Sequence, residues 1–532
     1  MREVKAWLVL FVAAIALVGC KRTASEQNAD STAPFKSDFR VLGQFHWVGK
    51  TQILTATNTW KLKQIWELPE SVKLETQIFD KLTAALSQAV ATNAVPSPLS
   101  TAALRGILDD LLREESVGEL RGTTNGPIEL ELAVRLPSDR VELWQSNITT
   151  ILNPLASEIG ITPSIKWDHL QDWTLLTLTS PESTQSAPDL LANFRQRLLT
   201  LSAATGGSST NYFLELQLDD ARLMRSLIGR TAVLPAIESL RLGMFGTGEA
   251  VKTRGTVTFT NPLPLPLAAW NIPSNSISQP LISFSALRGF KPYLESLPFW
   301  QSHQLGAAPD QIFFWSQDQA PWLHFFTTQS PDAKSQFLAL KDFLLEQVNP
   351  ELAPNRLGVF TWATNADQVT WKGVPFCNPT FTRSGTALQG GFVANAPTNR
   401  SLPVEFIQKL EAEPNLVYYD WENSGPQVGN WLQIGQLMRL AFSRAQLAHT
   451  NAGAPWLQVL HTNLAFCATS MTAETPQTLA FARSSTVGFS SIELQLLADW
   501  FDSPHFPRGL YTLDTPRKAL APATHSPQRP RQ

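Results

Sequence analysis

The chain is poor in cysteine and in charge, and it has no long apolar run after its first twenty residues. Only three of its 532 residues are cysteine, which excludes a small scaffold held together by disulfides. Charged residues make up 16% and hydrophobic residues 43%, a composition typical of an ordinary globular protein. Because no later segment approaches the ~18 consecutive apolar residues of a spanning helix, the sequence predicts a body without a transmembrane helix.

The familiar catalytic and cofactor motifs are missing as well. The sequence contains no G-x-S-x-G, S-x-x-K, H-E-x-x-H or G-x-G-x-x-G pattern and no Walker loop. The short Gly246-Thr247-Gly248 segment is better explained as a hairpin turn than as a phosphate loop. No two histidines stand at metal-ligand spacing on a common element. We therefore predict no metal site, no cofactor and no catalytic residue defined by a motif.

The net charge of −3 is unevenly distributed along the chain. Residues 515–532 contain four basic side chains and no acidic one, whereas the body from residue 37 to residue 514 carries about −9. Binding to nucleic acid needs a basic face that neutralises phosphates, so an acidic body predicts no nucleic-acid partner. The basic, Pro-rich segment 511–532 is predicted to be a disordered tail.

The N-terminus carries the most specific pattern in the chain. A basic start with Arg2 and Lys5 is followed by the apolar run Ala6–Val18, and the segment closes with Leu17-Val18-Gly19-Cys20. This pattern resembles the signal peptide of bacterial lipoproteins, in which a small residue precedes the cysteine to be acylated. The resemblance implies that residues 1–19 are removed, that Cys20 is lipidated, and that the membrane is a partner through this lipid.

The resemblance also implies a compartment, the bacterial cell envelope. The residue after Cys20 is Lys21 and not Asp, which in bacteria that use an Asp retention signal implies transport to the outer membrane. A transmembrane anchor is the first alternative, but thirteen apolar residues span about 20 Å of a hydrocarbon layer about 30 Å thick. An ordinary cleaved signal is the second, and it needs no cysteine at this place.

The two remaining cysteines, Cys377 and Cys467, leave two alternatives open. In an oxidising envelope they would be able to form a disulfide. Each follows a phenylalanine in an apolar setting, which suits free buried cysteines equally well.

The body is predicted to be α+β. Residues 20–37 are polar and are expected to form a flexible, lipid-anchored linker. Residues 38–126 are expected to hold one strand followed by helices, since apolar residues recur there every four positions. Beyond them, 172–182 resembles 321–332: each has Trp at its second position, continues as a β-rich strand, and ends in Ser-Pro-acid, a helix-start signal.

Extending both segments gives the order β-α-β-β-α-β, so we expect tandem ferredoxin-like modules with mixed or antiparallel sheets. Module 1 covers residues 127–275, module 2 covers 276–400, and an incomplete module 3 covers 401–510. Extra hairpins are expected at 240–260 and 381–394, and the Pro-punctuated segment 261–266 is the expected boundary between the first two modules.

Asp420 and Glu422 form the only pair with a catalytic appearance. They stand two apart at the end of a predicted strand, so their side chains share one face, and paired carboxylates among aromatics are what glycoside hydrolysis requires. The alternative is that these acids cap the following helix, which is expected to begin near Gly429, or meet water.

Three functions remain open on the sequence alone. The first is a non-enzymatic envelope lipoprotein that binds a protein or glycan partner or organises the cell surface. The second is an envelope glycan hydrolase that uses Asp420 and Glu422. The third is a solute-binding lipoprotein of a transporter, although such receptors usually alternate strand and helix around a parallel sheet.

Overall fold

The structure of the chain is a computed structural model that describes residues 39–90, 98–123, 128–159, 164–179, 188–203, 212–220, 236–274, 276–277, 280–302, 305–317, 324–354, 358–364, 367–373, 378–391, 402–441, 451–503 and 506–507. The predicted signal peptide, linker and basic tail, and Cys20 with them, lie outside the described residues. No helix within the described ranges is long and apolar enough to cross a membrane.

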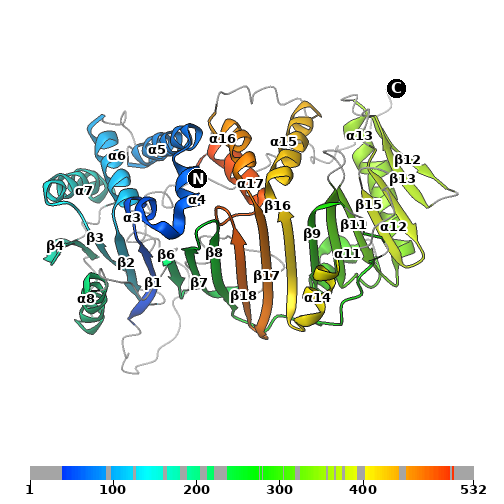
Figure 1. The fold of residues 1–532 in the computed structure, drawn as a ribbon, viewed down its shortest axis with the longest axis horizontal. Coiled ribbons are helices and arrows are strands. Elements are labelled where there is room, and N and C mark those ends of the chain that lie inside the picture. Colours follow the sequence, from blue (N-terminus) through cyan, green and yellow to red (C-terminus); the bar gives the residue numbers. More distant parts are fainter. Residues whose placement is uncertain are drawn as a thin grey trace, which may run out of the picture.

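All the strands of the described residues belong to one 18-stranded sheet (Figure 1). They are β1 (Arg40–Trp47), β2 (Ser116–Gly122), β3 (Ile128–Val134), β4 (Ser164–Leu170), β5 (Trp173–Thr179), β6 (Tyr212–Leu218), β7 (Ile237–Gly246), β8 (Val251–Phe259), β9 (Leu281–Arg288), β10 (Gln311–Gln317), β11 (His324–Gln329), β12 (Val359–Ala363), β13 (Gln368–Lys372), β14 (Thr380–Ser384), β15 (Ala387–Gly391), β16 (Leu416–Asn423), β17 (Phe466–Thr475) and β18 (Thr478–Ser485).

The pairings run in one line across the sheet. From edge to edge the order is β4-β5-β3-β2-β1-β6-β7-β8-β18-β17-β16-β9-β10-β11-β15-β14-β13-β12, and every pairing between described strands is antiparallel. The line joins both halves of the chain where β8 pairs with β18, for instance Thr256 with Ala480.

Helices cover both faces of this sheet. They are α3 (Lys50–Thr55), α4 (Trp60–Trp66), α5 (Pro69–Val90), α6 (Pro98–Arg113), α7 (Ser138–Ile159), α8 (Pro188–Ala203), α10 (Lys291–Ser296), α11 (Pro298–Ser302), α12 (Ala333–Phe343), α13 (Asn349–Leu352), α14 (Val404–Ala412), α15 (Ser424–Ala441), α16 (Gly453–Leu460) and α17 (Ser491–Asp502), with short helical turns at 57–59, 344–348 and 461–463.

The alternation of side chains along β5 explains how a strand is buried on both sides. Leu176 and Leu178 pack with α5, α6 and α7 on one face. Trp173 and Leu175 pack with Phe194 of α8 on the other. Because successive side chains of a strand point to opposite faces, a strand between two helical layers must be apolar at nearly every position. The same division recurs further along the sheet, where α14 packs on the face of α8 and α15 and α17 lie opposite (Figure 1).

Three stretches of the chain share one local plan, in which a strand is followed by helices, two strands and another helix. In each, the three strands are neighbours in chain order, β1-β2-β3, β9-β10-β11 and β16-β17-β18. The helices between the first two strands leave and re-enter the sheet at the same end, since the paired residues there are Trp47 with Ser116, Arg288 with Gln311, and Asn423 with Phe466.

This plan confirms an α+β fold with a large antiparallel sheet but corrects the expected strand order. A ferredoxin-like module places its first strand between the third and the fourth. In module 1, β4-β5-β3 follows that order, but β2 and β1, from residues 38–126, lie between β3 and β6. In module 2, β9 pairs directly with β10, and β12 lies beyond β15, β14 and β13. The reason is that a strand–helix–strand pattern looks the same whether its two strands are neighbours or are separated by another strand.

The two expected hairpins are confirmed. The pair β7 and β8 forms the first, with Gly248 in the turn at a φ of 90°, a conformation that favours glycine. The pair β14 and β15 forms the second.

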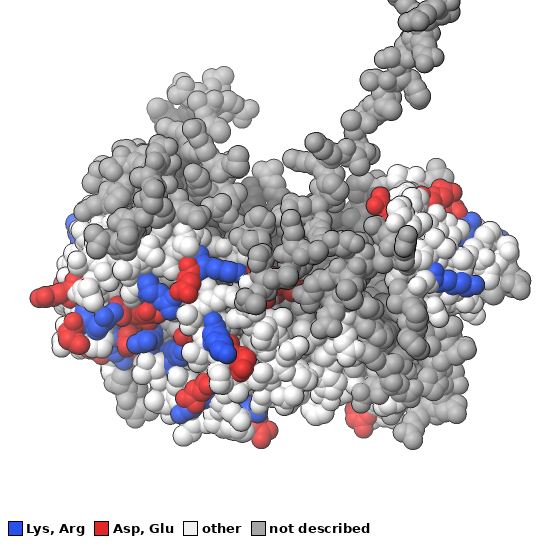
Figure 2. Space-filling model, turned by 90° about the horizontal axis from the view of Figure 1, so that it is seen from above, with Lys and Arg blue, Asp and Glu red and all other residues white. Residues whose placement is uncertain are grey.

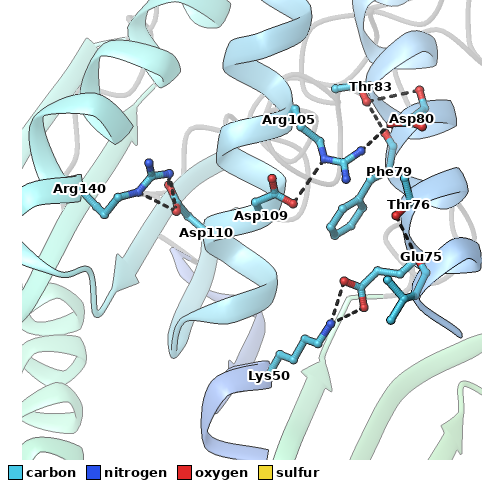
Figure 3. A network of polar contacts seen from close by, with 11 residues as sticks. Lys50, Glu75, Thr76, Phe79, Asp80, Thr83, Arg105, Asp109, Asp110 and Arg140 are labelled. Carbon is cyan, nitrogen blue, oxygen red and sulfur yellow. Dashed lines mark hydrogen bonds and ion pairs between the residues drawn. The ribbon is translucent and has the colours of Figure 1, made fainter. Parts of the chain in front are cut away.

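Ion pairs join the N-terminal helices to one another (Figure 3). Lys50 of α3 donates to both carboxylate oxygens of Glu75 in α5, at 2.8 and 2.6 Å. Arg105 of α6 donates to Asp80 of α5 at 2.6 Å, and its guanidinium lies 5.0 Å from the centre of the Phe79 ring.

On the far side of α6, Asp110 accepts two bonds from the Nη2 atom of Arg140 in α7, at 2.8 and 3.0 Å. Seen from above, acidic and basic side chains are accordingly intermixed over this end of the molecule (Figure 2). Asp110 is buried, whereas the two pairs between α3, α5 and α6 are partly exposed and contribute only about 0–1 kcal/mol each. Together these contacts fix the order of the helices.

Replacing Trp144 by alanine is expected to destabilise the fold strongly. Trp144 on α7 is 0% exposed and packs edge-on against Trp167 of β4, with ring centroids 5.6 Å apart. Loss of a fully buried aromatic side chain costs about 3–5 kcal/mol, so urea unfolding should show a markedly lower midpoint. Leu143→Ala, one residue away and 48% exposed, is the control and should change the midpoint little. Equal effects from the two variants would contradict the described packing of α7.

Candidate functional site

The two predicted acids lie on β16, between β9 and β17. Tyr419 and Trp421 point toward Phe406 of α14, with ring centroids 6.2 and 5.1 Å from it. Asp420 and Glu422 therefore point to the opposite face, toward α15 and α17. The expectation that the two carboxylates share one face is confirmed, and both line a cavity of about 340 Å³.

Glu422 holds three elements together. Its Oε1 accepts bonds from Ser424 Oγ at 2.8 Å and from the backbone N–H of Ser491 at 2.6 Å, and its Oε2 accepts from Ser491 Oγ at 2.5 Å. Ser424 begins α15 and Ser491 begins α17, so the carboxylate binds at the start of two helices. The side chain is 4% exposed. A carboxylate that is buried and already accepts three bonds is poorly placed to attack a substrate or to activate water.

This arrangement also corrects the expected start of the helix after β16. We expected that helix to begin near Gly429, but α15 begins at Ser424, directly after the strand. The alternative that the acids cap the following helix fits only in part, because the donor from α15 is the hydroxyl of Ser424. The backbone N–H that Glu422 accepts belongs to Ser491 of α17, almost seventy residues further along the chain.

Asp420 is in a different environment from Glu422. Its Oδ1 accepts one hydrogen bond, from Ser285 Oγ of β9 at 2.6 Å. Burial raises the pKa of the Asp420 carboxyl to about 6, and the negative charges of Glu422 and Glu493 act in the same direction, while Ser285 and Arg483 act against it. Desolvation dominates because a carboxylate loses more hydration than a single hydroxyl replaces.

Arg483 on β18 provides the positive charge of the cavity. Its guanidinium donates to both carboxylate oxygens of Glu493, to Thr469 Oγ1 at 2.9 Å and to the carbonyl of Gly488 at 3.2 Å. Glu493 also accepts the backbone N–H of Ser490 at 2.9 Å and completes a capping box at the start of α17. The arginine is thus fully engaged in holding α17 on the sheet.

The floor of the cavity continues as a chain of hydrogen bonds. Ser283 and Ser316 are joined at 2.6 Å between their hydroxyl oxygens, and Ser316 donates to Gln427 Oε1 of α15 at 2.8 Å. The layer between the sheet and α15 is therefore polar here, and these three side chains are paired with one another, as stable burial requires.

Sequence reasoning found the two acids but not their partners. Ser285, Arg483 and Ser491 are between 60 and 140 residues away from Asp420 or Glu422 along the chain. The one local signal available was Ser490-x-x-Glu493, a capping-box pattern that marks the start of α17.

The two remaining cysteines and the metal-ligating side chains are the last of the predicted features to be located. Cys467, opposite Glu422 in the ladder, is a buried free thiol, and burial raises its pKa to about 12. Cys377 lies outside the described residues, so a disulfide between the two stays a prediction. Within the described ranges, no group of three or more metal-ligating side chains comes together.

Comparisons with known proteins add little. No family model and no curated protein matches the sequence. Among solved structures, the chain is similar to one titled "Structure of crystal form III of TP0453", at 11% identity and a TM-score of 0.20, over 44% of this chain and 80% of that one. At that TM-score the likeness implies nothing about this chain.

Asp420→Asn is expected to stabilise the protein near neutral pH. The folded pKa of about 6 lies above the ordinary value of 3.8, so the buried group destabilises the fold whenever it must be ionised. This penalty is absent below pH 4, grows between pH 4 and 6, and reaches roughly 2–3 kcal/mol above that window. Asparagine keeps the acceptor for Ser285 without the charge.

The measurement is the free energy of unfolding of both proteins from pH 4 to pH 8. The advantage of the variant should grow with pH through the window from about 4 to 6 and then level off. A constant difference, or a variant that is less stable at pH 7.5, would contradict the described environment of Asp420.

Glu422→Ala is expected to destabilise the protein by about 3 kcal/mol or more, because it leaves three donors without their acceptor and each buried unpaired group costs about 1–3 kcal/mol. Glu405→Ala, at an exposed position on α14, is the matched control. Chemical denaturation provides the comparison. A Glu422→Ala variant as stable as the control would show that the three bonds contribute nothing.

Proposed function

We propose that this chain is a lipid-anchored protein of the bacterial cell envelope that binds a partner and does not act as an enzyme. The observation that carries the location is the Leu17-Val18-Gly19-Cys20 pattern at the end of a basic and then apolar N-terminus. Two acyl chains on one cysteine hold a protein on a bilayer stably, where a single chain holds it only marginally. The body then faces the aqueous side of the membrane, which fits an ordinary globular composition.

The binding role is supported by what the acidic pair does in the fold. Glu422 accepts three hydrogen bonds and Arg483 is held by Glu493, so the groups that would perform catalysis instead attach α15 and α17 to the sheet. We infer an envelope protein or a glycan as the partner, and the membrane as a second partner through the lipid.

Cys20→Ser is expected to abolish lipidation. Wild-type protein expressed in a Gram-negative host should incorporate a clickable palmitate analogue and stay with the membranes, whereas the variant should do neither. Cys467→Ser is the control and should label like the wild type, because that thiol is buried in β17. Unlabelled wild-type protein, or a labelled Cys20→Ser variant, would contradict the proposed lipid anchor.

The residue after Cys20 tests whether the protein reaches the outer or the inner membrane. In a host that uses an Asp retention signal, Lys21→Asp should move the labelled protein from the outer to the inner membrane. The same distribution for both proteins would contradict an outer-membrane destination.

Glycan hydrolysis is the second candidate, and the raised pKa of Asp420 is the observation that favours it. A carboxyl with a pKa of about 6 inside a cavity is suited to donate a proton to a leaving group. Release of soluble fragments from purified envelope glycan by the wild type, and not by Asp420→Asn, would replace the binding proposal. The transporter alternative is disfavoured by the antiparallel sheet.

A further inference from the structure

One stretch of the sheet has no helix from the described residues over it. On the face that carries α8 and α14, strands β6, β7, β8, β18 and β17 lie between these two helices (Figure 1). Directly opposed residues of neighbouring strands share a face, so the registers define a row that starts at Val117 under α8 and ends at Tyr419 under α14. Between them the row passes through His46, Glu215, Gly243, Arg254, Ala482 and Ser470.

Small side chains make this stretch hollow. Gly243, Ala480, Ala482 and Ser470 line a cavity of about 570 Å³. Gly243 is required at its position, since a Cβ atom there would lie 2.7 Å from the ring of Tyr212. The opposite sides of these strands are occupied differently, with Phe213, Val251 and Met244 packed against α3 and α4. The hollow therefore belongs to one face of the sheet.

Three arginines reach this cavity from three elements: Arg197 from α8, Arg241 from β7 and Arg254 from β8. Arg241 pairs with Thr256 and Arg254 with Gly243, so the two arginines are diagonal neighbours on adjacent strands, with Cα atoms roughly 7–8 Å apart. Both are exposed. Neither makes a hydrogen bond or an ion pair with any of the described residues, which distinguishes them from Arg121, Arg135, Arg140 and Arg483.

The surroundings orient two of these arginines, Arg254 and Arg197. The guanidinium of Arg254 lies 5.7 Å from the centre of the Phe245 ring, and that ring meets Tyr212 edge-on at 5.3 Å. Arg197 donates to Gln44 Oε1 at 2.8 Å, and Gln44 in turn donates to Gln217 at 2.8 Å. Aromatic stacking and side-chain hydrogen bonds of this kind orient guanidinium groups without neutralising them.

Two acids line the cavity, against three arginines. Glu215 lies 3.7 Å from His46 Nδ1, and this contact lowers the pKa of Glu215, with a smaller contribution from the positive charge of Arg197. Glu474 stands near the end of β17, three strands away from Arg241, or about 14 Å at 4.8 Å per strand. The part of the cavity around Arg197, Arg241 and Arg254 therefore carries more positive than negative charge.

We propose that this cavity binds a phosphate group carried by a larger organic molecule, held by Arg197, Arg241 and Arg254. Guanidinium groups donate in pairs to the oxygens of a phosphate, and three of them around one hollow match an anion with several acceptor oxygens. The cavity is much larger than a phosphate ion, and the rings of Tyr212 and Phe245 flank it, so there is room for an attached organic group. The source of the phosphate is either a soluble phosphate ester or a phospholipid headgroup.

The proposal rests on the binding role proposed above, but not on the lipid anchor. A negative phosphate titration would therefore leave the anchor standing, and a negative labelling of Cys20 would leave the phosphate site standing. The test uses the full-length chain with Cys20→Ser, so that no acyl chain contributes. Calorimetric titration with glycerol phosphate and with inorganic phosphate measures the soluble source. Flotation with phosphatidylglycerol vesicles, compared with phosphatidylcholine vesicles, measures the headgroup.

The test variant carries both Arg241→Gln and Arg254→Gln. The matched control is Arg195→Gln, which removes an ion-paired arginine from α8, two residues before Arg197. The double variant is expected to bind at least about tenfold more weakly, since hydrogen bonds to charged groups are the strong ones. The control should stay within about twofold, because exposed ion pairs contribute little. A second double variant, with lysine at both positions, keeps the charge, and thermal melting checks that each variant is folded.

The outcomes distinguish the two sources of the phosphate group. Binding of glycerol phosphate that depends on the arginines indicates a soluble ester, and arginine-dependent flotation with phosphatidylglycerol indicates the headgroup. Binding should also weaken as salt is raised. No binding of either source, or equal binding by the parent and by the folded double glutamine variant, would overturn the proposal.

Discussion

The antiparallel hydrogen-bond ladder is the constraint on which the rest of this structure depends. Every strand of the described residues except β4 and β12 is paired on both sides, so the backbone polar groups of the sheet are satisfied from one edge to the other. Such a sheet exposes two faces, and its stability depends on covering them. Helices do this most completely at the end of the sheet that carries α7 and α8, where β2 and β5 are buried along nearly their whole length.

The two faces of the sheet differ in which helices cover them, and their charged side chains have different partners as a result. Under α15 and α17 the covering layer is polar, and Glu422 and Arg483 are engaged in attaching those helices to β16 and β18, while Asp420 is bound by Ser285 of β9. On the other face, between α8 and α14, small residues leave a hollow, and Arg241 and Arg254 make no hydrogen bond or ion pair with the described residues. The same residue types therefore serve the fold in one place and are available to a ligand in the other, and the difference lies in whether a helix supplies the counter-charge.

The local elements of the fold could be predicted from the sequence, because local patterns of residues specify local structure. The Gly246-Thr247-Gly248 turn predicted the hairpin of β7 and β8, and the spacing of Asp420 and Glu422 predicted their common face. Pairing was not accessible: β8 and β18 are more than 220 residues apart, and nothing in either strand specifies the other. For the same reason Ser285 and Ser491 were missed as partners of the two acids, and the ferredoxin-like strand order was wrong where β9 meets β10.

Both cavities depend on the continuity of the sheet across β8 and β18, because the arginine-lined cavity spans this junction and the cavity of Asp420 lies beside it. Hydrogen exchange of the backbone amides measures it most directly. The amides of residues 251–258 and 478–485 should be among the most protected and should exchange with the same opening free energy, as interior strands of one unit do. Rapid exchange of both segments, as edge strands show, or protection of one without the other, would contradict it.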